Sequence, residues 1–163
     1  MNTTPWNLMP RLPLLAALVF LACFQPGAKA GDLPAGTVKG TFIPEEKPAV
    51  ALSYAVAFVD MKEEGKPVLL ILSDKKVPAE KWTSEFDLML AHPNFSGAVF
   101  FIDKEGTVFR TDTYTDGKQA SVSGYFKLTL DGAMGKDLKG SVKTNDQTSN
   151  GPKLDATFHA TLK

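Results

Sequence analysis

Residues that commonly carry out chemistry are sparse in this chain, which has 163 residues and only two histidines, His92 and His159. Imidazole gains or loses a proton near neutral pH, so a histidine beside a carboxylate is the first catalytic arrangement to look for. Asp155 shares the polar face of a predicted strand with His159. Four residues along an extended strand span about 13 Å, however, so these two side chains cannot share a metal ion without groups from neighbouring strands.

Other familiar catalytic arrangements are missing from the sequence. No Gly-x-Ser-x-Gly nucleophile elbow, phosphate-binding glycine loop or His-Glu-x-x-His zinc motif occurs. A zinc site needs three or four ligands, and the sole cysteine, Cys23, lies near the N-terminus, far from both histidines. We therefore predict no catalytic residues, no metal site and no cofactor. A pair of carboxylates brought together by the fold stays open as the basis of a small hydrolase.

Aromatic side chains are the other candidates for a binding surface, because exposed rings are enriched where proteins recognise partners. Tyr114 is predicted to be exposed, since it lies between Thr113 and Thr115 beside a turn signal. Trp82 is predicted to pack beneath a helix. The predicted binding residues are Tyr114, Trp82, His159 and Asp155, with Tyr54 and Tyr125 as further rings to consider.

Strand patterns dominate the elements that must position these residues. Residues 49–60 alternate strictly, with larger apolar residues on one face and mainly alanines on the other, which is a strong strand signal. Residues 68–73 and 97–103 are apolar on both faces and predict central strands. Further strands are predicted over residues 37–43, 107–113, 121–130, 138–144 and 153–162.

One helix is predicted, over residues 85–92, between the two central strands. Thr83 or Ser84 can cap its first amide groups, and Pro93 ends it. His92, in its last turn, is expected to satisfy terminal carbonyl groups rather than to act in catalysis. Four apolar residues recur at helical spacing and predict a buried stripe: Trp82, Phe86, Met89 and Leu90.

These elements predict an all-β domain, an antiparallel sandwich or small barrel of about seven or eight strands with one short helix. Gly40 and Gly140, inside two of the strands, are expected to mark a bulge or a close approach of backbones. The alternative is an α+β fold with a mixed sheet, in which the helix crosses over between parallel strands. The relative direction of strands 68–73 and 97–103 decides between the two.

The first thirty residues have the layout of a cleavable secretory signal. Arg11 precedes an uncharged apolar run at residues 14–24, and Ala28-Lys29-Ala30 gives a small-residue cleavage pattern. The run is shorter than the roughly 20 residues that cross a bilayer. We therefore expect a periplasmic or secreted protein with no transmembrane helix in the mature chain. The alternative is a lipoprotein anchored through Cys23.

Removal of residues 1–30 leaves a short lead-in at 31–36, predicted to be flexible, and a single β-rich domain over 37–163. Two of the 18 basic residues, Arg11 and Lys29, and none of the 18 acidic residues lie in the first thirty, so the remainder has a net charge of −2. This near-neutral balance argues against nucleic-acid binding. Because Cys23 falls inside the signal, packing and backbone pairing must stabilise the domain, which favours a bacterial envelope protein.

Three segments of the chain carry a resemblance to a known group. They are Leu72-Ser-Asp-Lys-Lys-Val-Pro78, Glu85-Phe-Asp-Leu88 and Asp155-Ala-Thr-Phe-His-Ala160. The chain resembles a group of uncharacterised exported bacterial β-rich proteins, which share a Leu-Thr/Ser-Asp-x-x-Leu/Val-Pro segment and a final Ala-Thr-Phe-x-Ala strand. The resemblance covers most of the mature domain and implies no activity, cofactor or catalytic residue.

These observations favour an exported, non-catalytic binding or interaction module of the bacterial envelope, whose partner is a protein, a glycan or a small ligand. A carrier of a small apolar ligand is the second hypothesis, with a cavity opened by the alanine face of strand 49–60. A small hydrolase that uses carboxylates alone is the third. The sequence leaves the oligomeric state open.

Overall fold

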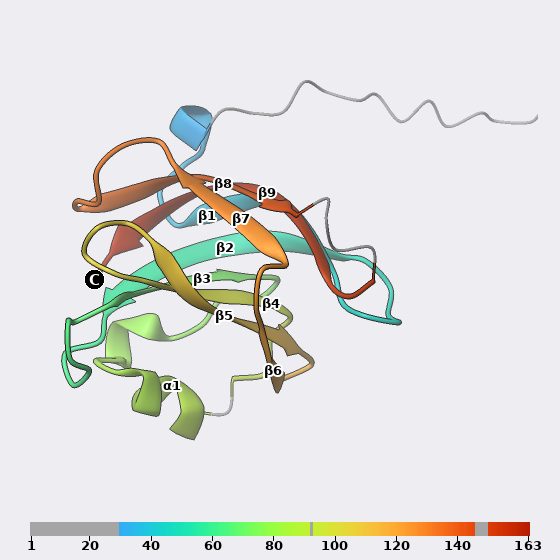
Figure 1. Ribbon diagram of the computed structural model, residues 1–163, viewed down its shortest axis with the longest axis horizontal. Coiled ribbons are helices and arrows are strands. Elements are labelled where there is room, and N and C mark those ends of the chain that lie inside the picture. Colours follow the sequence, from blue (N-terminus) through green and yellow to red (C-terminus); the bar gives the residue numbers. More distant parts are fainter. Residues whose placement is uncertain (1–29, 92, 146–149) are drawn as a thin grey trace, which may run out of the picture.

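The computed structural model describes residues 30–91, 93–145 and 150–163. Cys23, the rest of the expected signal before Ala30, and His92 lie outside the described residues. Three short helices are present among the described residues: η1 (Ala30–Asp32), η2 (Ala79–Lys81) and α1 (Glu85–Leu90). Nine strands form a single sheet (Figure 1): β1 (Thr37–Ile43), β2 (Val50–Val59), β3 (Val68–Ser73), β4 (Gly97–Ile102), β5 (Val108–Thr115), β6 (Lys118–Val122), β7 (Phe126–Leu130), β8 (Asp137–Thr144) and β9 (Lys153–Leu162).

The order of strands across the sheet is β6-β5-β4-β3-β2-β1-β9-β8-β7, and each neighbouring pair runs antiparallel. The prediction of an all-β antiparallel fold is therefore confirmed. β3 and β4 are antiparallel neighbours, so α1 does not cross over between parallel strands and the mixed-sheet alternative is wrong. A short parallel contact joins β2 to β9, at Val56 with Thr161 and Ala57 with Leu162, just past the point where β1 begins between them.

The sheet curls into a half-barrel whose concave face encloses the larger apolar core. In Figure 1, β7 crosses in front of β1 and β2. The curl brings the ring of Phe126 on β7 to the ring of Phe100 on β4, with centroids 6.3 Å apart. The fully buried large side chains of this inner core are Phe42, Leu70, Leu72, Phe100, Ile102, Leu138, Val142, Leu154 and Phe158.

Two glycines make the tight curl sterically feasible. A Cβ atom at Gly40 would overlap the backbone of Asp155 and Ala156 on β9, and one at Gly140 would overlap the carbonyl group of Thr129 on β7. The predicted close approach of backbones is confirmed at both positions. Larger residues there would hold neighbouring strands apart.

The convex face of β2 to β5 carries a second, smaller core beneath the segment between β3 and β4. Trp82, η2 and α1 lie on this face. The Trp82 ring meets Phe58 edge to face with centroids 6.1 Å apart. Trp82 is buried in the same cluster as Leu88 of α1, so the prediction that it packs beneath the helix is confirmed. The buried members of this outer core are Phe58, Leu69, Ile71, Val77, Ala79, Trp82, Leu88, Phe95, Val99, Phe101 and Tyr114.

Two strand predictions need correction. Residues 121–130 form parts of two strands, not one, because a turn around Gly124, whose φ is +72°, carries the chain from one end of the sheet to the other. The strict alternation over 49–60 also fails. Leu52 and Ala55 both belong to the inner core, because the pairing of β1 with β2 shifts register between Thr37 and Gly40.

Candidate functional site

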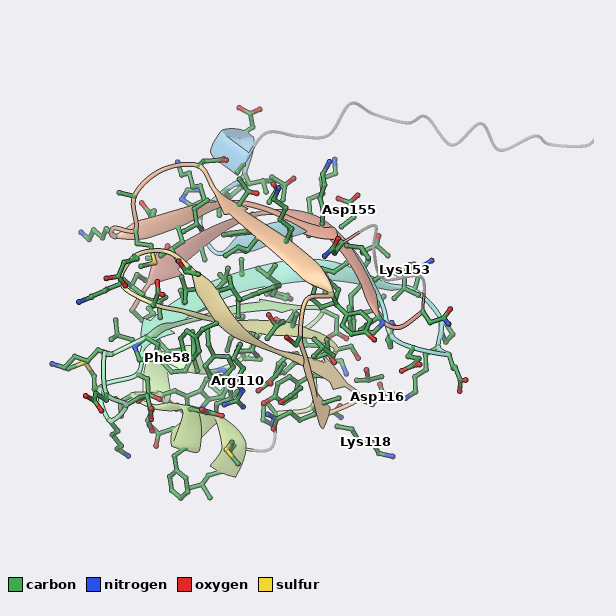
Figure 2. The ribbon with its side chains drawn as sticks, viewed as in Figure 1. Phe58, Arg110, Asp116, Lys118, Lys153 and Asp155 are labelled. Atoms are coloured by element: carbon green, nitrogen blue, oxygen red, sulfur yellow. The ribbon has the colours of Figure 1, made fainter. Side chains whose placement is uncertain are left out.

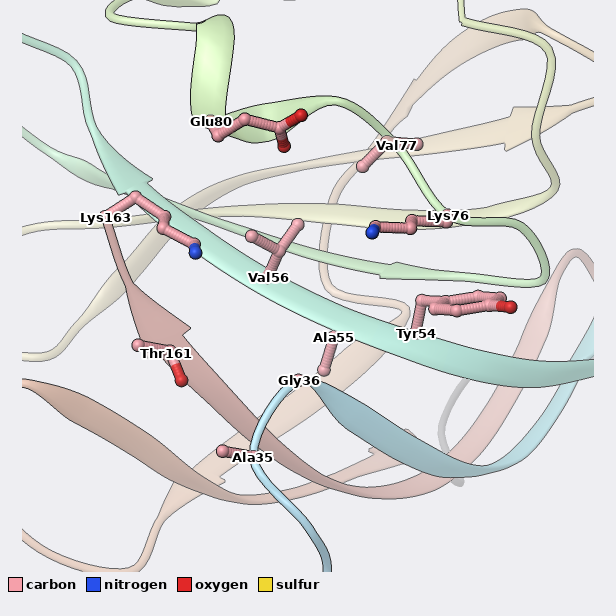
Figure 3. A pocket seen from close by; sticks show the side chains of 10 residues that line it. All are labelled: Ala35, Gly36, Tyr54, Ala55, Val56, Lys76, Val77, Glu80, Thr161 and Lys163. Atoms are coloured by element: carbon pink, nitrogen blue, oxygen red, sulfur yellow. The ribbon is translucent and has the colours of Figure 1, made fainter.

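A pocket of about 350 Å³ opens on the convex side, where β1, β2 and β9 meet the segment that follows β3 (Figure 3). We call it the Tyr54 pocket. It is lined by Ala35, Gly36, Tyr54, Ala55, Val56, Lys76, Val77, Glu80, Thr161 and Lys163. Its walls therefore combine an aromatic ring and two valines with three charged side chains.

The β2 wall follows from the strand's alternation. Tyr54 and Val56 are two residues apart and both face outward, and Tyr54 pairs with Ser73 at the end of β3. The Tyr54 side chain is 40% exposed. An aromatic ring that stays this open on a sheet face can accept a ligand without any rearrangement of the core.

The wall after β3 is held by hydrogen bonds to the start of β4. Asp74 accepts a hydrogen bond from the Ser96 amide (2.7 Å) through Oδ1 and donates its own amide to the Ser96 carbonyl group (3.0 Å). Lys76, Val77 and η2 follow directly. These bonds fix where the chain leaves β3 and hence where Lys76 and Val77 face Tyr54.

The third wall is formed where β1 first enters the sheet between β2 and β9. The Gly36 amide donates to the His159 carbonyl group (2.7 Å), and the Ala55 amide donates to the Gly36 carbonyl group (3.1 Å). Beyond this point, the Lys163 amide donates to the Ala57 carbonyl group (2.9 Å). The lead-in that we predicted to be flexible is thus bonded to two strands.

No ion pair among the described residues joins the three charged side chains of the pocket. Lys76 and Lys163 extend from opposite sides toward Val56, and Glu80 lies on a separate wall (Figure 3). The ion pairs of the described residues include none of these three side chains. Two ammonium groups with no carboxylate partner make the floor of this pocket attractive to an anion.

A motif that the sequence interpretation passed over lies beside the pocket. Ser73 and Lys76 have the Ser-x-x-Lys spacing of one class of serine nucleophile. Ser73 is fully buried, and its hydroxyl group donates to the Lys75 carbonyl group (2.8 Å). A hydroxyl group that is shielded from solvent and bonded to the backbone is placed to hold the turn after β3, not to attack a substrate.

A second group of charged residues joins α1 to β5 and β6, and we call it the Arg110 network. The Arg110 guanidinium donates to both oxygens of Glu85, at 3.1 and 2.8 Å, and to both oxygens of Asp112. It also lies over the Phe101 ring, 4.3 Å from the centroid. Figure 2 places Arg110 between the sheet and α1.

The Arg110 network is saturated with internal hydrogen bonds. The fully buried Asp112 carboxylate accepts further bonds from Gln119 (2.7 Å) and Ser121 (2.6 Å). Partial burial alone lowers the pKa of Arg110, but its hydrogen bonds to Asp112 and Glu85 outweigh that effect and raise the pKa above its ordinary value. The carboxylates of Glu85 and Asp112 both bind the permanently charged guanidinium of Arg110. Their role is therefore to hold α1 against β5.

No family model, curated protein or solved structure matches the chain. The resemblance to exported bacterial proteins therefore stays a prediction. Within residues 30–91, 93–145 and 150–163, no cluster of three or more His, Cys, Asp or Glu side chains is arranged to hold a metal ion. In the same ranges, no helix has the length and apolar character needed to span a membrane.

The prediction that Tyr114 is exposed is wrong. Its side chain is only 4% exposed, because it belongs to the outer core and stacks on Phe95 with ring centroids 4.7 Å apart. Burial away from water, followed by the negative charges of Asp112 and Glu85, raises the pKa of the Tyr114 phenol to about 12. Tyr114 is a core residue, and Tyr54 is the tyrosine that faces a pocket.

The other predicted binding residues do not meet in one site. The His159 ring is largely buried, with Nδ1 2.7 Å from the Leu33 carbonyl oxygen and Nε2 3.7 Å from an Asp137 oxygen. Asp155 is exposed and lies on the far side of the molecule from Arg110 (Figure 2). Trp82 is buried beneath η2 and α1. His159 anchors the lead-in, and neither it nor Asp155 lines the Tyr54 pocket.

The buried stripe predicted for the helix is also wrong. Trp82 and Leu88 are buried, whereas Phe86, Met89 and Leu90 are 57%, 48% and 62% exposed. α1 has only six residues, and Leu88 is the one of them that is buried in the outer core. The three exposed side chains form an apolar surface on the outside of α1.

Proposed function

We propose that the protein is an exported, non-catalytic binding module whose ligand is a small molecule with an apolar portion and an anionic group. The observation that carries the proposal is the Tyr54 pocket, where an open aromatic ring meets two lysines without carboxylate partners. Its volume of about 350 Å³ falls within the range of about 300–1,000 Å³ typical of small-molecule sites. Export rests on the signal layout of residues 1–30.

The chemistry of the walls defines the ligand class. The Tyr54 ring, Val56 and Val77 offer apolar contact, and an anionic group between Lys76 and Lys163 would gain from both ammonium charges. Glu80, on the separate wall, disfavours a second anionic group and can accept a hydrogen bond from the ligand. A monoanionic aryl or alkyl carboxylate meets all of these conditions.

A carrier of an uncharged apolar ligand is the second candidate, and the apolar wall of the same pocket favours it. That carrier was predicted to use a cavity along the alanine face of β2. Ala57 is fully buried in the inner core, whereas Ala55 lines the Tyr54 pocket. The two candidates therefore share one site and differ in whether the lysines contribute to affinity.

A titration that compares a charged probe with a neutral one tests the proposal. 3-Phenylpropionate and 3-phenylpropanamide are added to the ¹⁵N-labelled protein, and amide resonances are followed. We expect shifts at Gly36, Val56 and Val77, with the carboxylate bound more tightly by about fivefold for each lysine that contributes, since an exposed ion pair contributes up to about 1 kcal/mol.

The lysine contribution is isolated by substitution. Lys76→Gln with Lys163→Gln should bring the affinity for the carboxylate down to that for the amide, and Lys153→Gln, an exposed lysine outside the pocket, should leave it unchanged. Equal affinity of the unmodified protein for the two probes would instead favour the apolar carrier. Absence of shifts around the pocket with either probe would refute both candidates.

A further inference from the structure

The sheet of the half-barrel ends at β7, and one edge of this strand has no partner strand among the described residues. Among the described strands, β7 pairs with β8 alone. The Asn145 amide donates to the Tyr125 carbonyl group (2.7 Å), and the Asp131 amide donates to the Lys139 carbonyl group (2.8 Å). Residues 125, 127, 129 and 131 therefore bond to β8, because bonded and non-bonded positions alternate along an antiparallel strand.

The remaining positions of β7 direct their backbone groups away from β8. By the same alternation, the amide and carbonyl groups of Phe126, Leu128 and Leu130 point to the free edge. Their side chains face the inner core and are only partly buried. The edge thus offers three donors, three acceptors and an apolar rim, which is the pattern that an added strand requires.

A groove runs beside one end of this edge. It has a volume of about 530 Å³ and separates β7 from the part of β5 that β6 does not reach, since β6 pairs with β5 only from Thr111 onward. Its lining residues include Val108, Thr111 and Val122, with Phe126 on the β7 side. An extended segment laid against β7 would place its inward side chains in this groove.

The positive charge on the outer face of β7 and β8 indicates which kind of extended segment would bind at the free edge. Lys127 on β7 lies directly opposite Lys143 on β8, and the ion pairs of the described residues include neither lysine. Like charges placed directly opposite each other destabilise a sheet. Carboxylates on the outward side of a neighbouring strand would relieve this repulsion.

A second copy of the chain is a poor occupant of the same edge. Two β7 strands paired with each other would bring the Lys127 side chains of both copies to one face, where they repel. A partner with acidic residues at alternate positions has no such conflict. The charge of Lys127 therefore disfavours pairing between two copies of β7 and favours a partner strand that carries acidic side chains.

We propose that the free edge of β7 is a docking site for an extended segment of another protein, with alternating apolar and acidic residues, which pairs with Phe126, Leu128 and Leu130 as a tenth strand. The apolar side chains of the segment pack against Phe126 and Leu128, and its carboxylates lie beside Lys127. This site goes beyond the proposed function, because none of its residues lines the Tyr54 pocket.

The test uses a seven-residue peptide of alternating glutamate and valine, with blocked ends, and a lysine–valine peptide as its charge-reversed control. Amide hydrogen exchange of the protein is measured by NMR with each peptide. We expect the acidic peptide to slow exchange at Phe126, Leu128 and Leu130 and to leave Lys127 and Thr129, which already bond to β8, unchanged. The basic peptide should have no effect.

Two substitutions separate backbone pairing from charge. Leu128→Pro removes a free-edge amide that does not bond to β8, and it should abolish protection by the acidic peptide. Lys127→Glu creates an opposite-charge pair with Lys143 and should remove the preference for the acidic peptide. This second variant decides the outcome if Leu128→Pro disturbs the fold, as judged by circular dichroism.

Several results of the peptide experiment would contradict the proposal for β7. Equal protection by the two peptides, an unchanged preference in Lys127→Glu, or no protection at millimolar peptide would each overturn the proposal. Shifts confined to Gly36, Val56 and Val77 would report peptide binding at the Tyr54 pocket and would also overturn it. Because 3-phenylpropionate probes that pocket separately, the failure of one proposal does not decide the other.

Discussion

Asp112 ties β5 to β6 within the Arg110 network. Its carboxylate lies on β5, accepts bonds from Gln119 and Ser121 on β6, and reaches Glu85 at the start of α1 through Arg110. Burial is the main cause of the raised pKa of the neighbouring Tyr114 phenol, and the negative charges of Asp112 and Glu85 raise it further. The charge of Asp112 thus affects the protonation of Tyr114, although the two side chains contact different residues.

The raised pKa of Tyr114 predicts a specific loss of stability in alkali. In the unfolded chain the phenol titrates near pH 10, whereas in the folded protein its pKa is about 12. Between these values the unfolded state has lost the proton and the folded state retains it, so the free energy of unfolding falls as pH rises. Below pH 10 this group contributes no pH dependence.

Urea denaturation at pH 9 to 12 measures this effect. Tyr114→Phe should lose part of the alkaline fall seen in the unmodified protein, whereas Tyr54→Phe, at the exposed ring of the pocket, should retain it. If Tyr114→Phe and the unmodified protein show the same fall, the phenol is not held in its neutral form by its surroundings.

The error over Tyr114 has a physical origin. Its threonine neighbours and the nearby turn are polar, which is the usual signature of an exposed strand end. The sequence does not show that Phe95, from the loop after α1, folds back and stacks on the ring. Tyr54 was considered for an aromatic patch, but its lysine neighbours in the pocket come from distant segments.

At the scale of elements, α1 shows how capping and burial are determined separately. The Ser84 side chain accepts a hydrogen bond from the Asp87 amide, as predicted for the cap. Asp60, from the end of β2, accepts a further bond from the Glu85 amide (2.7 Å). Hydrogen bonds from the backbone and hydroxyl groups of Thr83 lower the pKa of Asp87 and favour its charged form beside the first turn.

The burial pattern of α1 predicts opposite outcomes for two nearby substitutions. Leu88→Ala should lower the free energy of unfolding by about 2–4 kcal/mol, because it removes a fully buried side chain from the outer core. Leu90→Gln should change it by less than about 0.5 kcal/mol, because that side chain is mostly exposed. Urea denaturation of both variants gives the comparison, and comparable losses would mean that Leu90 is buried in solution.

The position of α1 was predictable, but its buried face was not. Ser84 and Pro93 are local signals that limit the helix whatever it packs against. The choice of Leu88 over Phe86, Met89 and Leu90 depends on how Val77, Ala79, Trp82 and Phe95 already fill the convex face. Those contacts join residues from different segments, and hydrophobic spacing within one helix carries no information about them.

At the scale of the whole molecule, the strands were largely predictable and their arrangement was not. Alternation and turn residues located most strands because both are local properties. The place of β9 between β1 and β8 depends on pairing between the ends of the chain. The curl, which leaves β7 with a free edge, brings together side chains that are far apart in the sequence, as Phe126 and Phe100 are.

The curl itself can be tested at Gly40, where β1 approaches β9. A methyl group at this position would overlap the backbone of Asp155 and Ala156, which cannot move aside as a flexible side chain can. Gly40→Ala should therefore lower the free energy of unfolding by about 3 kcal/mol, at the upper end of the cost of overpacking a core. Gly135→Ala, where the added methyl group would meet nothing within 4 Å, should stay within about 0.5 kcal/mol. If urea denaturation gave both variants the same stability, β1 and β9 would not approach this closely, and the tight bend that brings β7 over β4 would need another cause.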